Sequence, residues 1–229
     1  MKSYFIDLDG VLIDSIDECW LTASKAYFGI VNEDARIKSF FYEHRGLVGP
    51  PFEFASLFKL AECLLGDPDS YNQKAIESKF KKINENSSYK EKEDFEAKFF
   101  LIRSDYKKNI DYWLGLHQLT DYGNFLRGKK LQDYFIITTK DRASTEDLMS
   151  HFELKFNHIY ANSDVKEMGS KSLIIETFLE RNNNYNRAIF VDDSVEHLKL
   201  CNSNIIDCYF ADWGYGNNES FEIFDRSLW

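Results

Sequence analysis

Proline, cysteine and long apolar runs are all scarce in this sequence of 229 residues. It contains three prolines and no low-complexity tract, and 44% of its residues are hydrophobic, which argues against a disordered chain. It has no apolar run of about 18 residues, the length that a membrane-spanning helix needs. Asp7 and Asp9 leave no room for an apolar signal core at the N-terminus. We therefore expect a globular cytoplasmic protein without a membrane segment.

The four cysteines argue against a C-x-x-C redox motif and against a zinc site. Cys19, Cys63, Cys201 and Cys208 form no C-x-x-C pair and no zinc-binding spacing. We expect free thiols in a reducing compartment.

Basic residues are in deficit, with 28 lysines and arginines against 38 acidic residues and a formal charge of −10. An acidic surface repels a phosphate backbone, so we do not expect a nucleic-acid partner. A small anionic substrate is still compatible with this charge, because a metal ion and one or two lysines can set the field locally. The sequence contains no indication of the oligomeric state.

What the sequence does contain is an alternation of short strands and helices. We expect strands over residues 4–6, 134–139, 158–160, 188–191 and 205–210, and helices over 141–152, 172–180 and 194–201. Such an alternation predicts a doubly wound α/β fold with a parallel sheet.

The segment between the first strand and residue 127 has a different texture. Apolar residues recur there at helical spacing and strand signals are nearly absent. The predicted organisation is thus an α/β core made of residues 1–14 and 128–229, with an all-helical insert at 15–127. We expect the many phenylalanines of the insert to form its core.

Polar residues follow three of the predicted strands. Asp7 and Asp9 end the first strand, Thr138 and Thr139 the second, and Asp192 and Asp193 a later one. Ligands bind at the carboxyl edge of such sheets, so these side chains should meet there. Close carboxylates repel each other unless a cation lies between them, and hard oxygen ligands suit Mg²⁺. We therefore expect a magnesium site.

Five short runs occur in this order: residues 5–15 (FIDLDGVLIDS), 135–140 (FIITTK), 169–171 (GSK), 190–194 (FVDDS) and 213–216 (WGYG). Together they resemble the motifs of the haloacid dehalogenase (HAD) superfamily, in its phosphoglycolate-phosphatase-like branch. The helical insert also stands where the helical cap of that family is found. The resemblance implies a Rossmann-like core, a Mg²⁺-dependent phosphatase activity on a small phosphate ester, and an aspartyl-phosphate intermediate.

The resemblance also implies residue roles. Asp7 would be the nucleophile, and Asp9 would protonate the leaving oxygen and then activate water. Thr138, with Thr139 and nearby backbone N–H groups, would hold phosphate oxygens. Lys171 would offset the charge of the phosphoryl group.

The metal would be bound by Asp7, the Asp9 carbonyl and Asp193, with Asp192 as a possible fourth ligand. Lys166, which we place in a polar loop, is a rival for the role of Lys171. We interpret His197 as a helix-surface residue without a catalytic role. Arg45 is either a substrate-binding residue of the insert or an ordinary helix-end arginine, and the sequence does not decide between these.

Two other functions fit the same motifs. One is a phosphomutase of the β-phosphoglucomutase type, which depends on insert residues that the sequence does not identify. The other is a non-catalytic, phosphate-binding regulatory module. The retention of Asp9 and Lys171 favours an enzyme.

Overall fold

The computed structural model describes residues 1–65, 72–217 and 220–225. The chain divides into two compact units. Met1–Asp14 with Gln118–Trp229 form one, which we call the α/β unit, and Ser15–His117 form the other, the helical unit.

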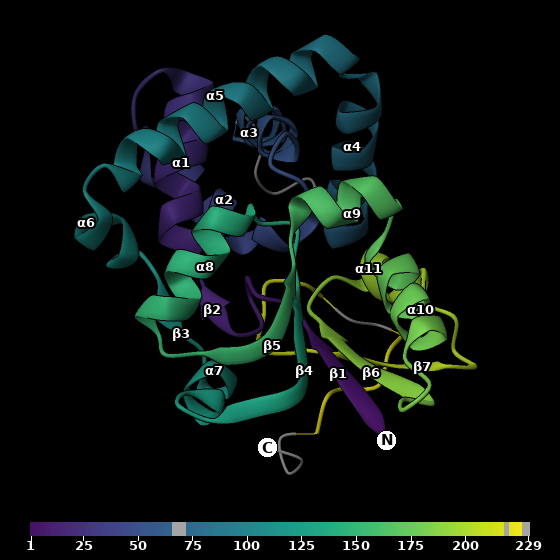
Figure 1. The fold of residues 1–229 in the computed structure, drawn as a ribbon. Coiled ribbons are helices and arrows are strands. Elements are labelled where there is room, and N and C mark those ends of the chain that lie inside the picture. Colours follow the sequence, from purple (N-terminus) through teal and green to yellow (C-terminus); the bar gives the residue numbers. More distant parts are fainter. Residues whose placement is uncertain (66–71, 218–219, 226–229) are drawn as a thin grey trace. The chain divides into compact units, whose positions relative to one another are not determined.

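The α/β unit is built on a five-stranded sheet (Figure 1). Its strands are β1 (Lys2–Ile6), β4 (Lys130–Ile137), β5 (Lys155–Tyr160), β6 (Arg187–Asp192) and β7 (Ile206–Phe210). They are all parallel and lie in the order β5-β4-β1-β6-β7. The chain thus winds outward from β1 first through β4 and β5 and then through β6 and β7. This confirms the predicted doubly wound α/β class.

The helices of this unit are α7 (Asp121–Leu126), α8 (Arg142–His151), α9 (Asn162–Met168), α10 (Lys171–Arg181) and α11 (Val195–Lys199). Figure 1 shows α10 and α11 beside β6 and β7. Alternate residues of the central strands form one buried core, because successive strand residues point to opposite faces. Phe5 stacks on Phe135 at 5.0 Å between ring centroids, and both pack with Phe190 and with Ile174 and Ile175 of α10.

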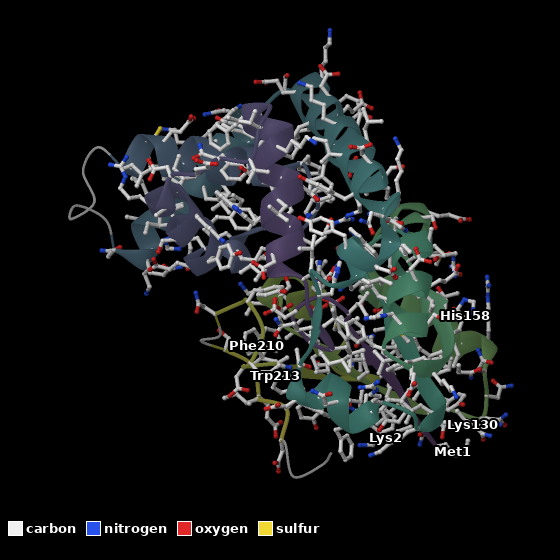
Figure 2. The ribbon with its side chains drawn as sticks, turned by 90° about the vertical axis from the view of Figure 1, so that its left-hand side faces the viewer. Met1, Lys2, Lys130, His158, Phe210 and Trp213 are labelled. Carbon is white, nitrogen blue, oxygen red and sulfur yellow. The ribbon has the colours of Figure 1, made fainter. Side chains whose placement is uncertain are left out.

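Because the strands are parallel, they all begin on one side of the sheet and all end on the opposite side. Figure 2 shows Met1, Lys2 and Lys130 close together, where β1 and β4 begin. The carboxyl ends of these strands therefore lie together at the opposite edge, where the predicted site residues follow.

The helical unit consists of α1 (Ile16–Phe28), α2 (Ala35–Glu43), the 3-10 helix η1 (Arg45–Leu47), α3 (Glu53–Leu64), α4 (Gln73–Asn86), α5 (Tyr89–Lys107) and α6 (Ile110–Leu114). Its core is rich in aromatic rings, with Phe41 stacked on Phe54 at 5.3 Å and on Phe58 at 5.5 Å. Among the described residues, none of the helices combines the length and apolar character required to cross a membrane.

The helical unit is shorter than the predicted insert and stops at His117, whereas the insert was expected to reach residue 127. The short strand β3 (Gln118–Leu119) pairs with β2 (Ile13–Asp14) in antiparallel fashion. Thr120 Oγ1 then donates a hydrogen bond to the carbonyl of Val11 at 2.7 Å. Residues 118–127 thus belong to the α/β unit because of contacts with the loop after β1, which helical periodicity does not reveal.

Candidate active site

The structure brings together three carboxylates from two strand ends that are far apart in the sequence. Ligand oxygens of Asp7, Asp192 and Asp193 all lie within 4.8 Å of one another, and all three residues are buried. The backbone N–H of Asp7 donates to the carbonyl of Val191 at 2.9 Å, which extends the pairing of β1 with β6 into the site.

Lys171 contacts two of the three clustered carboxylates. Its Nζ lies 2.8 Å from Asp7 Oδ1 and 2.8 Å from Asp192 Oδ2, and only 1% of its side chain is exposed. The residue is the first of α10, whose N-cap Ser170 accepts a hydrogen bond from the N–H of Leu173 at 3.1 Å. Burial would lower the pKa of Lys171, but Asp192 and Asp7 outweigh burial and raise it. Lys171 is therefore charged in this site.

Asp7 and Asp192 have opposite electrostatic balances. Burial raises the pKa of Asp7 to about 6, against the opposing effect of Lys171. Burial would also raise the pKa of Asp192, but Lys171 and His197 more than compensate and lower it. Asp192 is thus the more readily ionised of the two carboxylates that contact Lys171.

The oxygens of Asp192 are already engaged. Oδ1 accepts from the N–H of Ser194 at 2.8 Å, and Oδ2 contacts both Lys171 and His197 Nδ1, the latter at 3.0 Å. The rival lysine, Lys166, lies exposed on α9 and not in the polar loop where we placed it from the sequence. Lys171, and not Lys166, is the lysine that contacts Asp7.

Asp193 is held by the loop after β7. Its Oδ2 accepts a hydrogen bond from the N–H of Tyr215 at 2.6 Å. A Cβ on Gly216 would collide with the Asp193 carbonyl, and one on Gly10 would collide with its carboxylate. Gly10 also has a φ of +83°, which favours glycine. Because Gly10 and Gly216 lack a Cβ, the loop after β1 and the loop after β7 can both pack against Asp193. Phe210, the last residue of β7, and Trp213, in the loop that follows it, lie near each other in Figure 2.

Asp9 lies apart from the three clustered carboxylates and has its own cation. Lys140 Nζ donates to both Asp9 oxygens at 3.0 Å. Lys140 is almost fully buried, with 1% of its side chain exposed, against 18% for Asp9. In the sequence, Lys140 is the last residue of the run at 135–140 (FIITTK). Its position directly after two threonines at a strand end was the signal that could have identified it.

Thr138 and Thr139 occupy the loop between β4 and α8. Thr138 is buried, and its Oγ1 accepts a hydrogen bond from the N–H of Lys140 at 3.1 Å. Its own N–H donates to the carbonyl of Tyr160 at 2.9 Å, while the carbonyl of Thr139 accepts from Asn162 Nδ2 at 2.7 Å. The loop is therefore held against the segment where β5 ends and α9 begins.

Two further residues make contacts that the sequence did not indicate. His197 on α11 contacts Asp192, and 24% of its side chain is exposed. Arg45 belongs to the helical unit, where its Nη1 donates to the carbonyl of Val48 at 2.8 Å and its guanidinium lies 4.9 Å from the ring centroid of Phe54. These contacts fit a helix-end arginine with a structural role.

No protein-family model matches this sequence, and no curated protein resembles it closely enough to count as a match. Solved structures do resemble it. A predicted phosphoglycolate phosphatase from Haemophilus somnus 129PT matches with 14% identity and a TM-score of 0.58, over 96% of this chain and 89% of that one.

Protein Tyrosine Kinase A from Mycobacterium tuberculosis matches with 17% identity and a TM-score of 0.57, over 99% and 95% of the two chains. The putative HAD-hydrolase YfnB from Bacillus subtilis, which was solved with bound magnesium, matches with 12% identity and a TM-score of 0.51, over 91% and 86% of the two chains. Identities this low establish the fold but not the reaction. The chain has the fold of the HAD hydrolases, as its sequence motifs led us to expect.

Proposed function

We propose that this protein is a Mg²⁺-dependent phosphatase that hydrolyses a small phosphate ester through a phosphorylated Asp7. The observation that carries the proposal is the contact of Asp7 with Lys171 inside a cluster of three carboxylates at the carboxyl edge of the sheet. The phosphatase and hydrolase structures of the same fold support it.

The acidic cluster fits a divalent cation. It holds three carboxylates, of which Asp7 and Asp192 contact Lys171, and burial raises the pKa of Asp7 to about 6. Asp7, Asp193 and the backbone carbonyl of Asp9 would hold Mg²⁺, because the Asp192 oxygens are engaged by Lys171, His197 and the N–H of Ser194. Bound Mg²⁺ would supply positive charge for the anionic phosphoryl group.

In the first step an Asp7 carboxylate oxygen attacks phosphorus, the ester P–O bond breaks, and Asp9 gives its proton to the departing oxygen. Lys171 compensates the negative charge on Asp7 and the phosphoryl group. In the second step Asp9 takes a proton from water, which attacks the phosphoryl group and releases inorganic phosphate and free Asp7. The hydroxyl of Thr138 and nearby N–H groups would hold the phosphoryl oxygens.

The helical unit stands at the place in the sequence where the resembled family has its cap. We assign the selection of substrates to it, without naming a selecting residue, since Arg45 is engaged within the unit. Phosphomutase and non-catalytic functions remain the alternatives, and no contact described above favours either.

The test is hydrolysis of an aryl phosphate by the purified chain, with and without metal. Mg²⁺ should support turnover and Ca²⁺ should not, since Ca²⁺ takes more ligands at longer distances. After rapid quenching, mass spectrometry should find a phosphate adduct on the peptide that contains Asp7. Asp7→Ala should abolish both turnover and adduct. An adduct on another residue, or normal turnover by Asp7→Ala, would contradict the proposal.

The alternatives have their own outcomes in the same assay. A mutase would pass the phosphoryl group to a sugar phosphate added to the reaction faster than to water. A non-catalytic module would release no phosphate from any member of a panel of phosphorylated metabolites.

A further inference from the structure

Lys140 has no place in the mechanism above, although it is one of the most deeply buried cations of the molecule. Its side chain is 1% exposed, and its Nζ contacts the two Asp9 oxygens at 3.0 Å each. Among residues 1–65, 72–217 and 220–225, no other carboxylate contacts this ammonium group. A buried charge is costly unless it is paired, so the Lys140 position depends on Asp9.

The backbone of Lys140 is fixed independently of its side chain. Its N–H donates to Thr138 Oγ1 at 3.1 Å, and its carbonyl accepts from the N–H of Asn162 at 3.0 Å. The ammonium group therefore projects from a pinned loop. It does not swing freely from a surface.

The Lys140–Asp9 pair links two loops that are far apart in the sequence. Asp9 follows β1 and precedes Gly10, whose φ of +83° turns the chain. Lys140 ties this turn to the Thr138 loop, which lies 131 residues away in the sequence. The Asp9 carboxylate is consequently located by the same loop that would hold the phosphoryl oxygens.

We propose that Lys140 is a positioning residue, which holds the Asp9 carboxylate at a fixed place relative to the phosphoryl-binding loop so that Asp9 can exchange a proton with the leaving oxygen. This inference rests on the proposed phosphatase function and deepens it. Lys140 is distinct from Lys171, which contacts Asp7 and Asp192 but not Asp9.

The test compares two aryl phosphates whose leaving groups differ strongly in their need for a proton. Phenyl phosphate has a poor leaving group and dinitrophenyl phosphate a good one. Lys140→Met, which removes the charge but keeps most of the side-chain length, should lower kcat/KM for phenyl phosphate by about 10–100-fold, part of the usual 10²–10⁴-fold value of general acid–base catalysis. For dinitrophenyl phosphate the loss should stay below about 3-fold, because that leaving group needs little protonation.

A double-mutant cycle with Asp9→Asn gives the second measurement. If Lys140 acts through Asp9, adding Lys140→Met to Asp9→Asn should cause no further loss with phenyl phosphate. The double variant carries no buried unpaired charge, so it keeps the test valid even if Lys140→Met alone folds poorly. Near-UV circular dichroism checks the fold of each variant. Lys199→Met is the matched control, since Lys199 pairs with Glu196 on the exposed surface of α11 and should leave both substrates unaffected.

The outcomes separate this inference from the proposed function. Equal losses with both substrates, or a further loss in the Asp9→Asn background, overturn the role of Lys140 and leave the phosphatase standing. A wild-type protein that hydrolyses neither substrate in Mg²⁺ overturns both.

Discussion

Each of the two units buries an ion pair, and the two differ in their charge balance. In the helical unit Arg103 donates to both Glu18 oxygens at 2.8 Å, and Thr22 Oγ1 adds a third hydrogen bond to Glu18 at 2.9 Å. One negative charge meets one positive charge, and the guanidinium lies 4.6 Å from the ring centroid of Phe99. In the α/β unit three carboxylates lie together, and Lys171 contacts two of them, Asp7 and Asp192. A balanced buried pair needs nothing more, whereas an acidic excess calls for a cation.

The largest effect is expected when the ion pair between Glu18 and Arg103 is broken. Arg103→Met leaves Glu18 buried without its countercharge and should lower the free energy of unfolding by about 3–5 kcal/mol. Chemical denaturation measures it. Replacing both residues, Glu18→Met with Arg103→Met, should recover most of the loss, because no isolated charge then remains. A double variant as unstable as the single one would show that the pair has another role.

The second-largest effect is expected from replacing Lys171, the lysine that contacts two of the clustered carboxylates. Lys171→Met should lower kcat by about 10²–10³-fold, the range seen when one preorganised group that stabilises developing charge is lost. Lys166→Met is the matched control and should change kcat by less than about 2-fold, since surface substitutions are usually small in effect. Equal losses in the two variants would contradict the assignment of Lys171.

Because the cluster has more carboxylates than cations, we expect Mg²⁺ to stabilise the folded protein. A ligand present at about 100 times its Kd adds about 2.7 kcal/mol of stability, which raises Tm by about 5–10 °C in a chain of this size. Saturating Mg²⁺ should do this to the wild type, as followed by thermal denaturation. Asp193→Asn should lose the shift, whereas Glu18→Gln should keep it, although its starting Tm is lower. A full shift in Asp193→Asn would remove Asp193 from the metal site.

The smallest change in stability is expected from replacing His197. His197→Asn removes the contact with Asp192 Oδ2 and should cost about 1.5 kcal/mol of stability, as expected for a hydrogen bond to a charged group. The Tm shift in Mg²⁺ should persist, because His197 contacts Asp192 and not Asp7 or Asp193. A variant that loses the Mg²⁺ shift as completely as Asp193→Asn would overturn this division of roles.

Much of the α/β unit was predictable because its information is local. Short apolar strands followed by helices specified the parallel sheet, and the polar residues after β1, β4 and β6 specified the edge where a site would form. The motifs around Asp7, Thr138, Lys171 and Asp193 are short, and each was recognised within a few residues. The apolar periodicity of residues 15–127 likewise predicted a helical core.

The pairing of charges was decided by the tertiary structure alone. Lys140 meets Asp9 across 131 residues, and Lys171 meets Asp192 across 21. No local pattern distinguishes Asp192 from its neighbour Asp193, yet one contacts Lys171 and His197 and the other the N–H of Tyr215. Adjacent residues at a strand end point in opposite directions, so their partners depend on which loops pack on each side. The sequence by itself determined which residues reach the edge of the sheet, and only the packing of the loops determined which charge each of them meets.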